Sequence, residues 1–451
     1  MFGQETQHDP SRIERALSRP VPLWGLLLAV LLLFAATIGF GAIVDGWEKS
    51  GRLGRAAIGL ARVPDTVMDL FKSSAPIFHG AYDRLPGGFT RDAAFADAGY
   101  ALISPFDPAR GRSVVQLLRL SDGAVAHEYL PDVDAANARS RFASAHIDVR
   151  RDKDAPRNRL MHPLLLTDGG LVVHDSSPLA RYDACGKLVW ALDGIFHHST
   201  EQAADGSLWV PYRYPVPREP RVPATFWDDS LAHIGLDGKL IHIERVADIL
   251  ERNGLSRMWR ARPYADDPFH LNDIQPVLED GRFWRRGDLF LSLRNLSTVA
   301  LYRPSTGKIL WHADGPWRFQ HDVTILDDHR ISVFDNNSLI GYPDGAVNGV
   351  NRLIVHDFAS GADSAPWAAG FERNHIATRA QGRATPLPDG DAVVEETEQG
   401  RLLRIAPDGA VRWTYISADD QQRRMALAWA RYLSPQTDGP AIQASVNAKC
   451  S

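Results

Sequence analysis

Three histidines occupy corresponding places at the start of short apolar strands. His198 lies ten residues before Leu208, His321 lies ten residues before Ile331, and His270 opens the segment HLNDIQPV of the repeat between them. An isolated histidine is usually a hydrogen-bonded core or loop residue. Three histidines at a common phase instead favour one shared site.

An arginine accompanies these histidines. Arg294 lies on the strand that returns after His270, so we expect the two residues to be neighbours. A guanidinium is always charged and can bind two oxygens of a tetrahedral oxyanion at once, whereas it disfavours a divalent cation. Asp273 and Asp322 are the only carboxylates close to the same phase, so a metal held by the histidines stays a minor alternative and no metal is expected.

Two alternating turn signals indicate which elements position these residues. The first is a small or polar residue and a glycine followed by a short strand, and its six copies begin near residues 121, 184, 236, 305, 360 and 407. The second is a turn into an apolar strand, at 165–175, 203–212, 286–295, 326–336 and 387–397, with 98–104 as a first member. Two hairpins in each repeat of about 50–70 residues are typical of a four-stranded propeller blade. The sequence therefore predicts an all-β fold, a six-bladed β-propeller over residues 89–435.

The N-terminus carries an uncharged apolar run, VPLWGLLLAVLLLFAATIGFGAIV, over residues 21–44. A helix of this length can cross a hydrocarbon core of about 30 Å, and the run exceeds the apolar core of about 7–15 residues of a signal peptide. We expect a transmembrane helix over 21–44 between a cytoplasmic segment (1–20) and a stalk (45–88). Basic residues flank both ends, so the positive-inside rule gives almost no preference. Beyond the propeller we expect a helix within 417–436 and a disordered tail over 436–451.

Composition narrows the classes of partner. The net charge is −5 and no basic stripe occurs, which argues against nucleic acid. No phosphate-binding loop is present, because PSTGK at 304–308 lies in a hairpin repeat, and no cofactor is expected. The only cysteines, Cys185 and Cys450, cannot form a cysteine metal cluster, and whether they pair stays open at this point.

The segments around the histidines resemble the bacterial arylsulfotransferases, which use aryl sulfates as donors. The resemblance covers about residues 160–435. Its most specific parts are His270 and Asn272 with the following Ser–x–Arg strand, and the pair Gln320–His321 ahead of the motif Phe–Asp–Asn at 334–336. Where the family usually continues with Asn–Gly, this chain has Asn336–Asn337.

The resemblance implies roles for seven residues. It implies that His321 is the nucleophile, that His270 and Arg294 are active-site residues, and that His198 is a further active-site histidine. The double histidine leaves the register of His197 and His198 open. As substrate-binding residues we expect Asn272, Gln320 and His197.

The function implied is transfer of a sulfuryl group from an aryl sulfate to a phenolic or other hydroxyl acceptor through a sulfohistidine. The propeller is then expected on the periplasmic side of a bacterial inner membrane, held by a single-pass anchor, with the oligomeric state open. Two alternatives remain. One is a catalytically inactive propeller that serves as a membrane-anchored binding or assembly module. The other is a metal-dependent hydrolase that uses the same histidines.

Overall fold

Two units make up the chain, and they are described separately. The computed structural model describes residues 22–47, 49–61, 63, 79–84, 86–142, 148–339 and 346–450. One unit comprises Met1–Leu70 with Arg262–Tyr264, and the other comprises Phe71–Ala261 and Ala265–Ser451.

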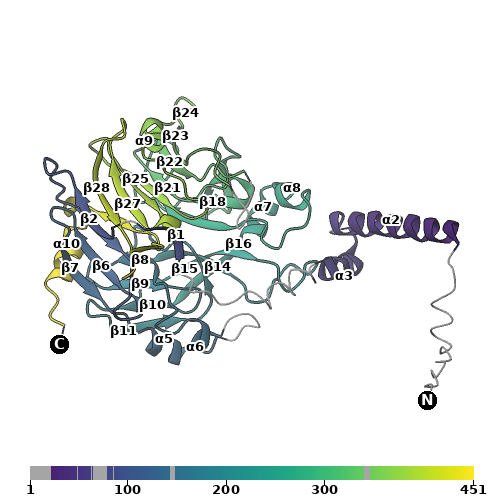
Figure 1. The fold of residues 1–451 in the computed structure, drawn as a ribbon, viewed down its shortest axis with the longest axis horizontal. Helices are drawn as coiled ribbons and strands as arrows, with labels where there is room; N and C mark the ends of the chain where they lie inside the picture. The colour runs from purple at the N-terminus through teal and green to yellow at the C-terminus, as the bar shows by residue number, and fades with distance from the viewer. Residues whose placement is uncertain are drawn as a thin grey trace, which may run out of the picture. The chain divides into compact units, whose positions relative to one another are not determined.

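The described part of the N-terminal unit contains two helices, the purple ones in Figure 1. Helix α2 (Leu23–Asp45) has 23 residues, none of them buried, and is long and apolar enough to cross a membrane, a property that N-terminal signal sequences share. Helix α3 (Gly51–Ala61) exposes Leu53 and Leu60. The expected cytoplasmic segment 1–20 and most of the expected stalk lie outside the described residues.

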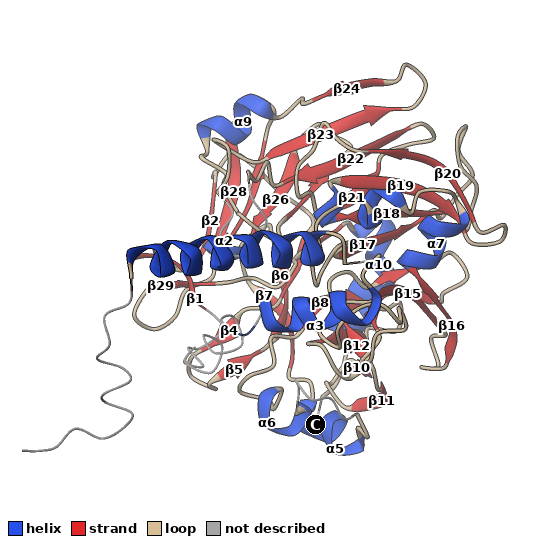
Figure 2. Ribbon diagram, turned by 90° about the vertical axis from the view of Figure 1, so that its right-hand side faces the viewer, coloured by secondary structure: helices blue, strands red, loops and turns tan. Residues whose placement is uncertain are grey.

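Six antiparallel sheets form the six-bladed β-propeller of the second unit, as expected (Figures 1 and 2). From the innermost strand outward, blade 1 contains β30 (Arg431–Leu433), β3 (Tyr100–Ile103), β6 (Val115–Arg119) and β7 (Val125–Tyr129), and blade 2 contains β8 (Met161–Leu165), β9 (Leu171–His174), β10 (Leu179–Tyr182) and β11 (Leu188–Leu192). Blade 3 contains β12 (Ile195–Phe196) and β13 (Glu201–Gln202), then β14 (Leu208–Arg213), β15 (Asp229–Ile234) and β16 (Leu240–Arg245). Blade 4 contains β17 (Leu271–Pro276), β18 (Leu289–Leu293), β19 (Thr298–Arg303) and β20 (Lys308–Ala313).

The last two blades follow the same plan. Blade 5 contains β21 (Val323–Ile325), β22 (Arg330–Asp335), β23 (Arg352–Asp357) and β24 (Ala362–Ser364). Blade 6 contains β25 (Arg383–Pro386), β26 (Ala392–Glu396), β27 (Arg401–Ile405), β28 (Val411–Ile416) and β2 (Gly88–Arg91). Short helices lie in the connections: α5 (Val133–Arg139), α6 (Val149–Asp152), α7 (Val246–Arg252), α8 (Arg257–Arg260) and α9 (Ala368–Arg373).

The glycine turns predicted from the repeat are the hairpins between the third and fourth strands of the blades. Gly186 is an example, with a φ of +77° and a position at which a Cβ atom would lie 2.6 Å from the carbonyl oxygen of Leu130. Only glycine fits such a turn without strain. Outer strands alternate, as in β20, whereas every residue of β18 is buried. Burial thus decreases from the inner to the outer strands of blade 4.

Segments from both ends of the second unit complete the ring. β30 is the innermost strand of blade 1, where Leu433 pairs with Tyr100, and β2 is the outermost strand of blade 6, where Phe89 pairs with Tyr415. The helix expected within 417–436 is therefore wrong. This segment forms β29 (Arg423–Met425) and β30, because the ring needs an inner strand at this place.

The described part of the C-terminal tail, residues 436–450, is ordered, which corrects the disorder expected there. Residues Pro435–Val446 form helix α10, capped by the Ser434 hydroxyl, which accepts from the Gln436 N–H. The Tyr129 hydroxyl donates to Ser445 Oγ at 2.7 Å and ties the helix to blade 1. A disulfide joins Cys450 to Cys185 of the β10–β11 turn, with the two Cα atoms 5.3 Å apart. The pairing left open by the sequence is thus made.

Candidate active site

The segments that enter the innermost strands of blades 3, 4 and 5 bring three histidines together. The Nε2 atoms of His198 and His270 lie 3.2 Å apart, and the ring centroids of His198 and His321 lie 6.1 Å apart. His198 and His270 both adopt a left-handed backbone, with φ of 56° and 51°. Such conformations are costly for side chains with a Cβ atom and cluster at functional sites. The convergence expected from the repeat phase is present.

The protonation of His321 is fixed by Asn336. His321 Nδ1 lies 2.6 Å from Asn336 Oδ1, while Asn336 Nδ2 donates to the carbonyl oxygens of Thr378 and Gln381 at 3.1 and 2.8 Å. Because those two bonds use the amide protons, Oδ1 must be the atom that faces the histidine. His321 therefore carries its proton on Nδ1, and its Nε2 lone pair accepts the N–H of Gln381 at 3.0 Å.

His321 is neutral at neutral pH. Burial, the positive charge of Arg294 and the neighbouring His270 hold the pKa of His321 well below its usual value. Burial, followed by His270 and His197, lowers the pKa of His198 in the same way. A buried neutral imidazole with one fixed lone pair is the form that can act as a nucleophile.

Arg294 follows β18 in the short turn Arg294–Leu296, only 3% exposed. Its N–H donates to the carbonyl oxygen of His270 at 3.1 Å, so the two residues are neighbours as expected. The guanidinium donates to Asn295 Oδ1 at 3.0 Å and lies 5.4 Å from the ring centroid of Phe319. The positive charge of Arg294 lowers the pKa of His321.

Two carboxylates that the sequence did not single out contact the histidines. His270 Nδ1 is hydrogen-bonded to Asp267, three residues earlier in the chain. His197 Nδ1 lies 2.9 Å from His198 Nδ1, and its Nε2 lies 3.4 Å from Asp229 Oδ1. Burial raises the pKa of Asp267, but the charge and hydrogen bond of His270 outweigh it and leave that pKa below its usual value.

The amide nitrogens of Gln320 and Asn272 bind neighbouring strands of the site. The Gln320 amide donates to Ser292 Oγ and to the carbonyl oxygen of Thr298, at 3.2 and 3.0 Å. Asn272 Nδ2 in turn donates to the carbonyl oxygen of Gln320 at 2.9 Å. Both amide nitrogens are used within blades 4 and 5, whereas Asn272 Oδ1 and Gln320 Oε1 are buried without a hydrogen-bond partner in the described structure, so the expected contact with substrate stays a prediction.

The departure from the family motif at Asn337 has a structural reason. Asn337 adopts a left-handed φ of 49°, a conformation that glycine and asparagine tolerate best. Its Nδ2 donates to the carbonyl oxygens of Asn348 and Val350 at 2.7 and 3.0 Å. Asparagine thus serves where the family uses glycine, and the preceding Asn336 keeps its contact with His321.

Aromatic side chains surround the imidazoles. Trp227 stacks near His270, with ring centroids 6.0 Å apart and an interplanar angle of 17°, and the Arg213 guanidinium lies 4.1 Å from the Trp227 ring. Trp429 packs edge-on against His162 at 3.9 Å. Trp227 and Trp429 lie on loops between strands, where the hydrophobic repeat gave no signal.

A belt of charged side chains follows the histidines along the inner strands. Asp322 pairs with Arg383 at 3.3 Å, and Glu201 pairs with Arg431 at 3.0 Å. Burial, followed by the charge of Asp322, raises the pKa of Asp273. The guanidinium groups of Arg383 and Arg431 thus pair with carboxylates that a metal cation would need as ligands. Within the described residues, ligand atoms with metal-site spacing occur instead in the outer β21–β22 turn, at Asp327, Asp328 and His329.

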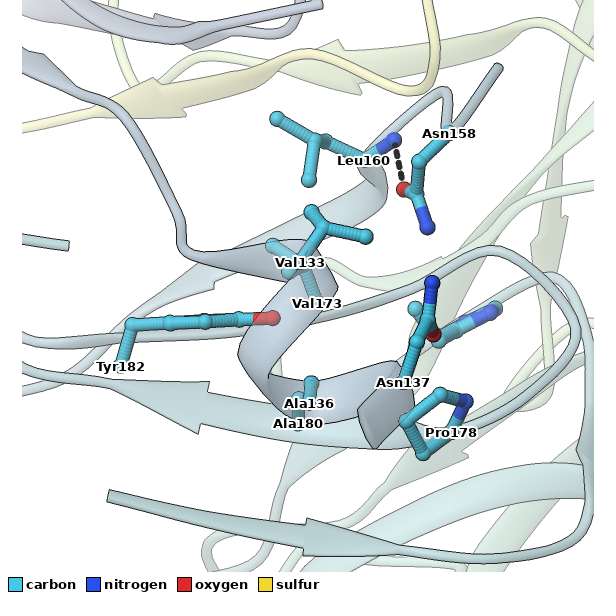
Figure 3. A pocket seen from close by; sticks show the side chains of 10 residues that line it. Val133, Ala136, Asn137, Asn158, Leu160, Val173, Pro178, Ala180 and Tyr182 are labelled. Atoms are coloured by element: carbon cyan, nitrogen blue, oxygen red, sulfur yellow. Dashed lines mark hydrogen bonds between the residues drawn. The ribbon is translucent and has the colours of Figure 1, made fainter. Parts of the chain in front are cut away.

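A small cavity beside blade 2 is not a substrate site. Figure 3 shows its wall, built by α5 residues such as Val133 and Asn137 and by Tyr182 of β10. Its volume of about 10 Å³ holds at most one water molecule.

Known proteins resemble this chain to different degrees. The family described as Arylsulfotransferase (ASST) matches residues 162–418, which include every residue of the histidine site. No curated protein gives a significant match. A solved protein of unknown function from Bacteroides caccae is 12% identical with a TM-score of 0.45, and the match covers 75% of this chain and 99% of that one. The virginiamycin B lyase of Staphylococcus aureus is 14% identical with a TM-score of 0.34, and the match covers 58% of this chain and 71% of that one. The hydrazine synthase of Kuenenia stuttgartiensis is 10% identical with a TM-score of 0.39, and the match covers 71% of this chain and 81% of that one. Such distant likenesses carry no argument about activity. The family match, in contrast, covers more than half of the sequence and shows that the chain belongs to the arylsulfotransferase family.

Proposed function

We propose that this protein moves a sulfuryl group from an aryl sulfate to a phenolic or other hydroxyl acceptor, and that His321 carries the group between the two half-reactions. The single observation that supports this role most is the fixed tautomer of His321. Asn336 holds the proton on Nδ1, and burial keeps the ring neutral, so Nε2 presents a lone pair at neutral pH.

In the first half-reaction Nε2 of His321 forms a bond to sulfur. The bond between sulfur and the aryl oxygen breaks, and its electron pair stays on the departing phenolate. The Gln381 N–H, which lies 3.0 Å from Nε2, has to release that nitrogen as the donor approaches. It is then close enough to donate to a sulfuryl oxygen.

Charge shifts toward the phenolate and the sulfuryl oxygens in this step. Arg294 supplies a buried positive charge near the reacting nitrogen, and such preorganised charge stabilises a transition state strongly in a site that excludes water. His198 and His270 are the candidates for protonating the phenolate. The second half-reaction reverses these steps with the acceptor hydroxyl.

We infer that the propeller faces the periplasm of a bacterial inner membrane, with residues 1–20 in the cytoplasm. Helix α2 supports an anchor, and the Cys185–Cys450 disulfide supports an oxidising compartment. A C-terminal reporter that is active only in the cytoplasm would refute this orientation.

Turnover of a chromogenic aryl sulfate in the presence of a phenol tests the activity. We expect transfer by the wild-type chain, loss in His321→Ala and retention in His312→Ala, because His312 is exposed on β20, the outermost strand of blade 4. A binding module would show no turnover in any of the three. A metal-dependent hydrolase would release phenol without an acceptor and would lose activity with a chelator.

A further inference from the structure

Helix α3 carries apolar residues on two faces, and its inner face is covered. Gly54, Ala57 and Ile58 form this buried face. Gly54 lies against the turn before the helix, since a Cβ atom on it would lie only 2.6 Å from the carbonyl oxygen of Trp47. Trp47 is itself buried and packs edge-on against Tyr264 of the same unit, with ring centroids 5.3 Å apart.

The outer face of α3 carries a second apolar stripe, and this one is exposed. Leu53, Leu60 and Val63 are 61%, 64% and 49% exposed, and Ala56 is exposed between them. Spacings of three and four residues place these positions on one side of a helix. A helix that faces water normally presents charged and polar residues on its outer side. The outer stripe of α3, residues 53, 56, 60 and 63, is therefore a surface suited to an apolar partner.

The place of α3 in the chain identifies that partner. Helix α2 ends at Asp45 and α3 begins at Gly51, and the connection is a closed turn in which the Gly46 carbonyl oxygen accepts from the N–H groups of Lys49 and Ser50 at 3.0 and 3.2 Å. Even fully extended, this connection would span only about 20 Å. A membrane-spanning helix of 23 residues is about 34 Å long and fills a hydrocarbon core of about 30 Å. Helix α3 therefore begins in or next to the headgroup layer.

The charges around the outer stripe favour the same partner. Helix α3 contains arginines but no carboxylate. Arg52 is exposed beside the stripe, and Lys49 is exposed just before the helix. An apolar stripe flanked by lysine and arginine is typical of a helix that lies in the interface of a bilayer, with its apolar side chains at the acyl boundary and its cations near anionic headgroups.

We propose that the outer stripe of α3 binds the surface of the bilayer that α2 spans. The chain is then held by one spanning helix and one interfacial helix, which lies between the anchor and the propeller in the sequence. This inference rests on α2 as a membrane anchor and is independent of the chemistry at His321.

A fluorescent label on the outer stripe of the full chain tests the proposal. The two natural cysteines are joined in a disulfide, so one introduced cysteine can carry the label. The Leu60→Cys chain is placed in vesicles of phosphatidylethanolamine and phosphatidylglycerol that contain lipids with a nitroxide quencher at the top of the acyl chain. We expect quenching at least about threefold stronger than for a label at Lys239→Cys, whose side chain is 84% exposed in the β15–β16 turn. A label at Phe34→Cys, in the middle of α2, should be quenched by a nitroxide deep in the acyl chain.

Two variants of the Leu60→Cys chain sharpen the outcome. Adding Leu53→Glu places a carboxylate in the outer stripe and should lower the quenching to that of the Lys239→Cys label. Val125→Glu is the matched control, an exposed apolar position on β7 of the propeller, and should leave the quenching unchanged. Quenching that survives Leu53→Glu would contradict the stripe as the binding surface. A label at residue 60 that is no more quenched than one at residue 239, while the label at residue 34 is quenched, would overturn the interfacial helix and leave both the anchor and sulfuryl transfer intact. If the label at residue 34 is not quenched either, the anchor is wrong and the proposal fails with it.

Discussion

Replacing Asn336 by alanine should slow sulfonation of His321 without changing the fold. When Nε2 bonds to sulfur the ring becomes cationic, so the Nδ1–H bond to Asn336, 2.6 Å long, changes from a neutral to a charged hydrogen bond. Neutral hydrogen bonds contribute about 0.5–1.5 kcal/mol and charged ones about 1.5–3 kcal/mol. The difference, about 1–2 kcal/mol, is gained only in the transition state, and its loss corresponds to a rate about 5–30 times lower.

The assay is the burst of phenol release after mixing the enzyme with 4-nitrophenyl sulfate and no acceptor. Asn351→Ala is the matched control, because Asn351 is buried in the same network, donating to the carbonyl oxygens of Asn336 and Thr378 at 2.8 and 2.9 Å, but does not contact the histidine. Both variants should lose about 1–3 kcal/mol of stability, and only Asn336→Ala should lose most of the burst rate. A burst within about twofold of wild type for Asn336→Ala would refute the role of the Nδ1 contact.

Three further predictions concern charge, the disulfide and pH. Arg294→Lys should lower transfer about 10²–10³-fold in a folded protein, because a lysine lacks the planar fork that binds two sulfuryl oxygens, and a wild-type rate would remove this role. Cys185→Ser should lower the free energy of unfolding by about 2–5 kcal/mol, since the disulfide closes a loop of 265 residues, and a reductant should destabilise wild type but not the variant. Burial lowers the pKa of His174 to about 4 from 6.5, so the unfolded chain binds a proton below pH 6.5 while the native chain does not. The contribution of His174 to the free energy of unfolding is complete above pH 6.5 and falls by on the order of 3 kcal/mol toward pH 4. Denaturant midpoints at pH 7 and 4.5 would detect this loss, and His174→Gln should reduce the difference between the two midpoints.

Local turn chemistry made the blades predictable. Each glycine turn, such as the one at Gly186, encodes its own hairpin whatever the rest of the chain does. The strand that closes the propeller ring could not be predicted from such local signals. The segment before Leu433 alternates apolar residues in a manner that fits a helix or a strand, and pairing with β3, more than 300 residues away in sequence, decides between them.

The candidate active site was likewise predictable only in part. Repeat phase predicted that His198, His270 and His321 converge, because corresponding residues of different blades face the same channel. Their partners come from other loops and carry no repeat signal. Gln320 illustrates the limit: it precedes His321 directly, yet neighbouring residues of an extended segment point to opposite sides, so its amide enters blade 4.

The central claim is that His321 carries the sulfuryl group, and one measurement addresses it most directly. The wild-type chain is incubated with an aryl sulfate without acceptor, digested under alkaline conditions and examined by peptide mass spectrometry. We predict one sulfonate on the peptide that contains His321, lost when a phenol is added. An adduct on His198 or His270 instead, or an active His321→Ala variant that forms no adduct, would contradict the account.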